Sequence, residues 1–228
     1  MQDPDASPFN AVPAAALLLA GALFGAELLF LMAKSGFIGG TRGGEDWRYL
    51  AIERFAFAGE VADRLVGGQR LAARDIARLV TYPFVHYGFT HMVIATVFVL
   101  ALGKLVAEQV RQIAVPVVFF AASIAGAMAY GLLLDDRLPL VGAYAGAYGL
   151  IGAYTWILWT GLGRRGENRL TAFRLIGALC VMQLAFALVF GARNDWVAEL
   201  TGFATGFFAV GLVAPGGWAR LVARMRAR

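Results

Sequence analysis

The sequence predicts an all-α membrane protein, a bundle of six transmembrane helices with a large interfacial first loop. Of its 228 residues, 60% are hydrophobic and only 15% are charged, against roughly 25% charged residues in an ordinary soluble domain. Such a chain has too few charges to cover the surface of a water-soluble fold. Its apolar residues gather in six long segments, and a polar stretch separates the first of these from the second.

The six apolar segments are predicted to be membrane spans, because each has about the 20 residues that a helix needs to cross a hydrocarbon core of roughly 30 Å. They run over residues 13–33, 89–110, 113–134, 140–162, 171–192 and 196–214. The membrane domain is therefore expected to occupy residues 13–214, between a short tail, 1–12, and a basic tail, 215–228. The first tail carries no positive side chain, so we expect a retained span after it rather than a cleaved signal.

The polar stretch 34–88 carries eight basic and six acidic side chains and is not a span. Its apolar residues recur at helical spacing between charged ones: Trp47, Leu50, Phe57, Val61 and Leu65, then Leu71, Ile76, Leu79 and Val80. This pattern is typical of short amphipathic helices in the membrane interface. A loop domain packed on the helix bundle would give the same pattern, and the sequence leaves both interpretations open.

Basic residues predict the orientation of the spans. One side of the membrane receives those of the second-to-third and fourth-to-fifth connections and of the final tail: Lys104, Arg111, Arg164, Arg165, Arg169, Arg174, Arg220, Arg224, Arg226 and Arg228. That side is expected to be cytoplasmic, which places both termini in the cytoplasm. The opposite short loops carry only Arg137 and Arg193, although the stretch 34–88 adds eight basic residues there.

Two carboxylic acids lie within spans, where an ionisable group is costly unless it is paired or hydrated. Glu27 lies well inside the first segment, and Glu199 lies near the outer end of the sixth. We expect Glu27 to be a structural carboxyl that is protonated or hydrogen-bonded. Glu199 is the better candidate for a functional position, because its segment, which also contains Gly202 and Gly206, carries one of the motifs of the resemblance given next.

Three motifs carry a resemblance to a known family. They read R-L-V-T-Y-P-F-V-H-Y-G-F-T-H over 78–91, G-A-Y-A-G-A-Y-G-L-I-G-A over 142–153 and A-E-L-T-G-F-A-T-G over 198–206. In motif order, spacing and six-span layout the chain resembles the rhomboid family of intramembrane serine proteases. The resemblance implies a rhomboid-like bundle. The small residues four apart in the last two motifs also favour a close approach of the fourth and sixth spans.

The resemblance implies that the catalytic residues are replaced. In the family the fourth span carries G-x-S-G-x-x-x-G with the nucleophilic serine, and the sixth carries a histidine base before G-x-x-x-G. Superimposing the glycines puts Tyr144 at the serine position and Glu199 at the histidine position. The family's second span offers a histidine and an asparagine to the oxyanion, and the matching residues here are His91 and Ala95.

These replacements predict a pseudoprotease with no catalytic residues. A hydroxyl nucleophile needs a base that takes its proton near neutral pH, whereas Tyr144 offers a phenol with a reference pKa near 10. Its ring also fills the space that a scissile carbonyl needs. The missing asparagine at Ala95 would alone cost on the order of 100-fold in rate, by analogy with other single oxyanion donors.

We expect neither a metal site nor a cofactor. His86 and His91 are the only histidines, and five residues is a poor spacing for two ligands on one helical face. Cys180 is the only cysteine and lies in an apolar run, where a small buried hydrophobe is the usual role. The resemblance implies that the residues aligned with Arg78 and His86 support the first loop. Nucleic acid is not an expected partner, because the basic residues do not gather on a soluble face.

Among the expected functions, the first is a non-catalytic rhomboid-like protein of a bacterial-type inner membrane. It would bind transmembrane helices of other membrane proteins, or join a larger membrane complex, in assembly or quality control. Lipids are further expected partners. Aromatic residues of the fifth and second spans are candidates for the binding face, although lipid-facing aromatic residues are the more usual arrangement: Phe173, Phe186, Phe190 and Phe98.

Two alternatives remain open at this point. One is an altered peptidase that uses Glu199 as base and water or Tyr144 as nucleophile. The other is a proton or small-solute pathway through Glu27 and Glu199, against which the lack of an obvious inverted repeat argues. If the fourth and sixth spans cross, we expect a hydrogen bond between Tyr144 and Glu199 that locks the former active site. The alternative is that the residues at these two positions were substituted independently after catalysis was lost.

Overall fold

The computed structural model describes residues 12–38, 44–134, 138–190, 193–214 and 226. The predicted tails, 1–12 and 215–228, lie outside these residues except for Val12 and Arg226. Arg137, used for the predicted orientation, also lies outside them.

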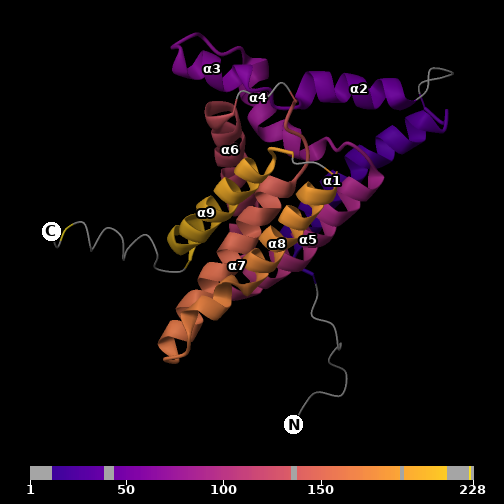
Figure 1. The fold of residues 1–228 in the computed structure, drawn as a ribbon. Coiled ribbons are helices and arrows are strands. Elements are labelled where there is room, and N and C mark those ends of the chain that lie inside the picture. The colour runs from indigo at the N-terminus through magenta and orange to yellow at the C-terminus, as the bar shows by residue number, and fades with distance from the viewer. Residues whose placement is uncertain (1–11, 39–43, 135–137, 191–192, 215–225, 227–228) are drawn as a thin grey trace, which may run out of the picture.

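The regular structure of the described residues is helical, with one isolated β-bridge between Phe57 and Leu140. The α-helices are α1 (Ala14–Lys34), α2 (Gly44–Phe55), α3 (Glu60–Val66), α4 (Ala73–Thr81), α5 (Phe89–Gln109), α6 (Ala114–Leu133), α7 (Tyr144–Arg164), α8 (Arg174–Phe190) and α9 (Trp196–Val213), and the 3-10 helices are η1 (Tyr82–Phe84) and η2 (Arg169–Phe173). The long helices form one bundle, and α2, α3 and α4 lie across one end of it (Figure 1). The predicted all-α class is confirmed for this part of the chain.

Four of the described helices, α1, α5, α6 and α9, are long and apolar enough to cross a membrane. The other two long helices, α7 and α8, do not meet both conditions. With 17 residues, α8 is short, and α7 is rich in glycine, tyrosine and tryptophan, which lower its mean hydropathy. The chain is therefore a helical protein with several spans.

The fourth apolar segment begins as extended chain, and its helix starts only at Tyr144. Leu140 exchanges backbone hydrogen bonds with Phe57 at 2.8 and 3.1 Å, which ties the segment to the chain between α2 and α3. Gly142 then turns the chain with φ +94°, a conformation that favours glycine. A Cβ at Gly142 would also lie 2.7 Å from the His91 ring. This turn places the first residues of α7 beside the start of α5.

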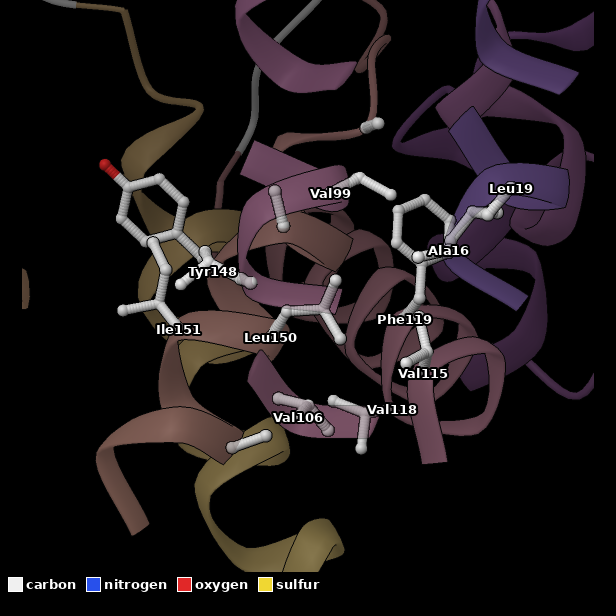
Figure 2. Close-up of a cluster of buried hydrophobic side chains, with 14 of the residues drawn as sticks. Ala16, Leu19, Val99, Val106, Val115, Val118, Phe119, Tyr148, Leu150 and Ile151 are labelled. Atoms are coloured by element: carbon white, nitrogen blue, oxygen red, sulfur yellow. The ribbon is translucent and has the colours of Figure 1, made fainter. Parts of the chain in front are cut away.

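The core lies around α7, which packs on α5, α6 and α9. Figure 2 shows the apolar side chains that meet there from four helices: Ala16 and Leu19 of α1, Val99 and Val106 of α5, Val115, Val118 and Phe119 of α6, and Tyr148, Leu150 and Ile151 of α7. Interdigitated side chains of this kind hold helix positions closely, because a packed core has little free volume.

Glycines bring α7 and α9 into backbone contact. A Cβ on Gly206 would overlap the carbonyl oxygen of Gly149, and a Cβ on Gly202 would overlap that of Ala145. On the facing side, a Cβ on Gly152 would overlap the carbonyl oxygen of Phe203. Close approach through small residues is a common way for membrane helices to associate, and it sets the distance between the motifs of the fourth and sixth segments.

The stretch between α1 and α5 forms helices and packs on the bundle. Phe57, Val61 and Ala62 are buried, and a Cβ on Gly131 of α6 would lie 2.6 Å from that of Ala62. Arg78 of α4 fastens this region internally: its guanidinium donates to the carbonyl oxygens at the end of α2, Glu53 at 2.6 Å and Arg54 at 3.2 Å. This stretch therefore contains helices that pack on the bundle, but Phe57 and Leu71 of the predicted helical pattern lie in the connections between them. Tyr49 and Leu50 of α2 remain exposed.

Candidate functional site

A cavity of about 60 Å³ lies between the start of α5, the start of α7 and the start of α9. Its lining residues are Tyr82, His91, Leu140, Val141, Gly142, Tyr144, Ala145, Asp195, Ala198 and Glu199. The structure thus brings three of the predicted positions, His91, Tyr144 and Glu199, to one small chamber. Ala95 is buried in the apolar core and does not line it. A polar chamber of this size holds a few water molecules at most.

Tyr144 lines the cavity and packs against His91 of α5. Its ring stacks on the His91 ring, with centroids 4.8 Å apart and an interplanar angle of 16°. Its hydroxyl donates a hydrogen bond to the His91 carbonyl oxygen at 3.4 Å. His91 is itself held by the Tyr87 amide, which donates to Nδ1 at 3.4 Å. The Tyr144 side chain therefore fills the space beside the His91 ring.

Glu199 has partners that the sequence did not suggest. The side-chain amide of Gln183 on α8 donates to its carboxyl group, and the Tyr148 hydroxyl lies within hydrogen-bonding reach of the same group. Glu199 is 7% exposed, so these partners offset the cost of removing its carboxyl group from water.

The prediction of a hydrogen bond between Tyr144 and Glu199 is wrong, because each side chain has other partners. The reason is geometric: stacking on His91 directs the Tyr144 hydroxyl toward α5, and Tyr148, one helical turn later, faces Glu199 instead. Gln183 was missed because a single glutamine in an apolar run has many structural explanations. Its position as the polar residue of a long apolar helix was the one available signal.

One residue that lines the cavity, Asp195, belongs to an ion pair. Its carboxylate accepts a hydrogen bond from the Arg193 guanidinium at 3.0 Å. The same guanidinium lies 4.6 Å from the centroid of the Tyr87 ring, and the Tyr87 hydroxyl donates to the Pro139 carbonyl oxygen at 2.8 Å. These contacts connect the starts of α5 and α9 with the chain before α7.

The sequence profile of the Rhomboid domain matches residues 73–216, well over half of the chain. The chain belongs to the rhomboid family. A search of curated proteins finds no match. Rhomboids are intramembrane serine proteases, so this member is a multi-pass membrane protein, and the predicted resemblance is confirmed.

In this rhomboid Glu27 is paired in a buried ion pair. Arg48 of α2 donates from Nη2 to Oε1 at 2.6 Å and from Nη1 to Oε2 at 2.9 Å, while Glu27 is 1% exposed. Arg48 also donates to the His86 carbonyl oxygen at 2.7 Å and lies 5.0 Å from the centroid of the Phe30 ring. Glu27 does not line the cavity, and its role is structural: with Arg48 it joins α1, α2 and the chain before α5.

His86 is a buried neutral residue of the rhomboid scaffold. The Ala143 amide donates to its Nε2 at 3.4 Å, and its ring centroid lies 5.4 Å from that of His91. Burial, together with the neighbouring His91 and Arg48, lowers the pKa of His86 to about 3. The ring thereby supports the turn that leads into α7 and stays uncharged near neutral pH.

We expect acid to destabilise the protein through His86. Its pKa is about 3 in the folded chain, against 6.5 for an ordinary histidine such as that of the unfolded chain. A lowered histidine pKa contributes stability that is complete above pH 6.5 and is lost as pH falls toward 3. Between pH 7 and pH 5 this group should cost about 2 kcal/mol of the free energy of unfolding. Denaturant titration in detergent at the two pH values measures the loss.

The control for this expectation is His86→Gln, which keeps an acceptor for the Ala143 amide but does not titrate. Its free energy of unfolding should change much less between pH 7 and pH 5 than that of the unmodified protein. Parallel pH dependence in both proteins would show that other groups carry the effect.

Among the described residues, no group of three or more His, Cys, Asp and Glu side chains is placed to hold a metal ion. Phe173 of η2 is half-buried, with its ring 6.3 and 5.8 Å from the Phe203 and Phe207 rings of α9. Phe98 is also half-buried against the core. The side chains of Phe186 and Phe190 lie outside the described residues.

Proposed function

We propose that this rhomboid is a pseudoprotease that binds the transmembrane helix of another membrane protein without cleaving it, as a chaperone, assembly factor or subunit of a membrane complex. In this proposal α7 and α8 also cross the membrane, so that six spans and an interfacial first loop, 34–88, form the family's layout. Both termini lie in the cytoplasm of a bacterial-type cell, and the protein resides in its inner membrane. The occupation of the serine and histidine positions by Tyr144 and Glu199 in one small cavity carries the proposal.

Among the described residues no serine hydroxyl lines the cavity, which supports a non-catalytic role. The chain has three serines, Ser7, Ser35 and Ser123, and neither Ser35 nor Ser123 lines the cavity. Ser123 is fully buried on α6, where its carbonyl oxygen accepts a hydrogen bond from Tyr82 at 2.8 Å. A hydroxyl without a neighbouring base is a poor nucleophile.

The packing of α8 supports a lateral site for a client helix. Among the described residues α8 makes its main contact with the preceding η2 rather than with α5 or α9. Its outer face exposes Val181, Leu184 and Leu188. A hydrogen bond from Gln183 to Glu199 joins α8 to α9. A client helix that enters beside α8 would therefore break this bond but few other contacts between α8 and the bundle.

The altered-peptidase alternative rests on the presence of Tyr144 and Glu199 in the same cavity, and it is tested directly by a cleavage assay. The proton-pathway alternative gains no support, because Glu27 is bound by Arg48 and does not line the cavity with Glu199.

Site-specific photo-crosslinking in native membranes tests the proposal. A photoreactive residue replaces Leu184 on α8, Val97 on α5 or Leu18 on α1, all of which expose apolar side chains. We expect the α8 and α5 probes to capture the same membrane protein through its transmembrane helix, and the α1 probe to capture lipid. Mass spectrometry of the adducts identifies the crosslinked segment.

The α1 probe is the matched control, because Leu18 is 76% exposed and Leu184 is 62% exposed. Identical adducts from all three positions would indicate unspecific collision in the membrane and would contradict a client site beside α8.

A further inference from the structure

A second cavity, of about 520 Å³, opens at the other end of the bundle. It is lined by Gln109, Val110, Trp156, Ile157, Trp159, Thr160, Gly163, Arg164, Arg169 and Ala214. These residues come from the ends of α5, α7 and α9 and from η2. Figure 1 shows that the end of α7 lies far from α2, α3 and α4, which cover the opposite end. The cavity is therefore separate from the chamber around Tyr144 and Glu199.

Two arginines, Arg164 and Arg169, give one wall of this cavity a positive charge. The Arg169 guanidinium lies 5.0 Å from the centroid of the Trp159 ring, which is within the range of a cation–π interaction. It also lies directly against Gly163, where a Cβ would overlap its Nε and Nη2 atoms. Arg164 stands beside it in the lining, and none of the described lining residues is acidic. Two guanidinium groups without a carboxylate among the lining residues favour an anionic ligand.

The remainder of the lining suits an acyl chain. Val110, Ile157 and Ala214 present apolar surface, and Trp156 and Trp159 add two aromatic rings to it. Tryptophan is enriched where membrane helices meet the headgroup region. The volume lies within the usual range of about 300–1,000 Å³ for pockets that take small molecules.

We propose that this cavity binds an anionic phospholipid. Arg164 and Arg169 hold the headgroup phosphate, and the first part of an acyl chain lies along Val110, Trp156 and Ile157. Basic pockets between membrane helices bind the headgroups of such lipids, and the planar guanidinium suits phosphate oxygens. The site does not depend on the proposed pseudoprotease function.

Native mass spectrometry of the purified full-length protein in mild detergent tests the proposal, with phosphatidylglycerol or phosphatidylcholine added in equal amounts. We expect one phosphatidylglycerol to bind in preference. The variant R164A/R169A should weaken that binding by about 30-fold, as expected for removing two basic residues at an anionic headgroup.

Two further variants distinguish lipid binding at this cavity from binding that depends only on the net charge of the protein. R220A/R224A removes the same number of positive charges from the tail 215–228 and should leave binding unchanged. Gly163→Ala keeps every charge but displaces the Arg169 guanidinium from α7, so it should weaken binding by severalfold. Because the displaced atoms are the end of a flexible side chain, this variant should still fold.

Several outcomes would overturn the proposal. Equal loss of binding in R164A/R169A and R220A/R224A would assign the interaction to general charge. Equal retention of phosphatidylcholine would remove the requirement for an anionic headgroup. Displacement of the lipid by inorganic phosphate at millimolar concentration would show a simple anion site that does not recognise the acyl chain.

Discussion

Replacing Gly206 by alanine is expected to lower the free energy of unfolding by about 3 kcal/mol or more. The added Cβ would overlap the carbonyl oxygen of Gly149, and a backbone atom cannot move aside as the end of a side chain can. Overpacking usually costs about 1–3 kcal/mol, and this site lies above that range because the two helices must separate. Titration with a denaturing detergent, followed by circular dichroism, measures the change.

Gly161→Ala is the matched control for this expectation. Gly161 lies on α7, the same helix as Gly149, and a Cβ there would meet nothing within 4 Å. Its replacement should change stability by less than about 1 kcal/mol and can be favourable, because alanine has the higher helix propensity. Equal effects of the two substitutions would contradict the close contact between α7 and α9.

Removing the buried carboxylate in Glu27→Ala is expected to cost about 3–5 kcal/mol of the free energy of unfolding. Breaking a buried ion pair leaves the remaining charge without its partner. Here that charge is Arg48, whose side chain is 21% exposed and which also joins the His86 carbonyl oxygen. The measurement is again equilibrium unfolding in detergent.

The comparison pair for Glu27 and Arg48 is Arg165 with Glu167, at 3.0 Å and with side chains 63% and 53% exposed. Arg165→Ala should cost less than about 1 kcal/mol, as exposed ion pairs usually do. A loss of stability in Glu27→Ala no larger than that of Arg165→Ala would show that the buried pair contributes nothing to the join between α1 and α2.

The helices of this rhomboid follow closely from its sequence. Long apolar runs set α1, α5, α6 and α9 to within two residues of the predicted segments, because burial in lipid requires an unbroken backbone hydrogen-bond pattern. The start of α7 was predicted four residues too early. Leu140 pairs with Phe57 and Gly142 turns the chain, and neither long-range pairing nor a turn of this kind alters the local hydropathy.

The positions around the cavity follow from motif spacing, whereas the side-chain partners do not. The glycine pattern places Tyr144 and Glu199 on helices that cross, and the structure puts both in one chamber. The hydrogen bonds depend on the rotation of α8 and on the stacking of Tyr144 on His91. These arise from packing among several helices, and so Gln183 and Tyr148 were not identified as partners of Glu199.

The partner of Glu27, Arg48, could likewise not be predicted from the sequence. The sequence marks Glu27 as an intramembrane carboxyl that needs a partner, but eight basic residues lie between 34 and 88. Only the placement of α2 against α1 selects Arg48 among them.

A cleavage assay in liposomes addresses most directly the inference that the rhomboid site no longer cuts peptide bonds. The protein is reconstituted with a transmembrane substrate that an active rhomboid protease, used as positive control, cleaves. Peptide fragments are measured by mass spectrometry, and serine-type reactivity is measured by labelling with a fluorophosphonate. We expect no fragments above the level of protein-free liposomes and no label. Fragments or label that disappear in Tyr144→Phe or Glu199→Gln would contradict the pseudoprotease assignment.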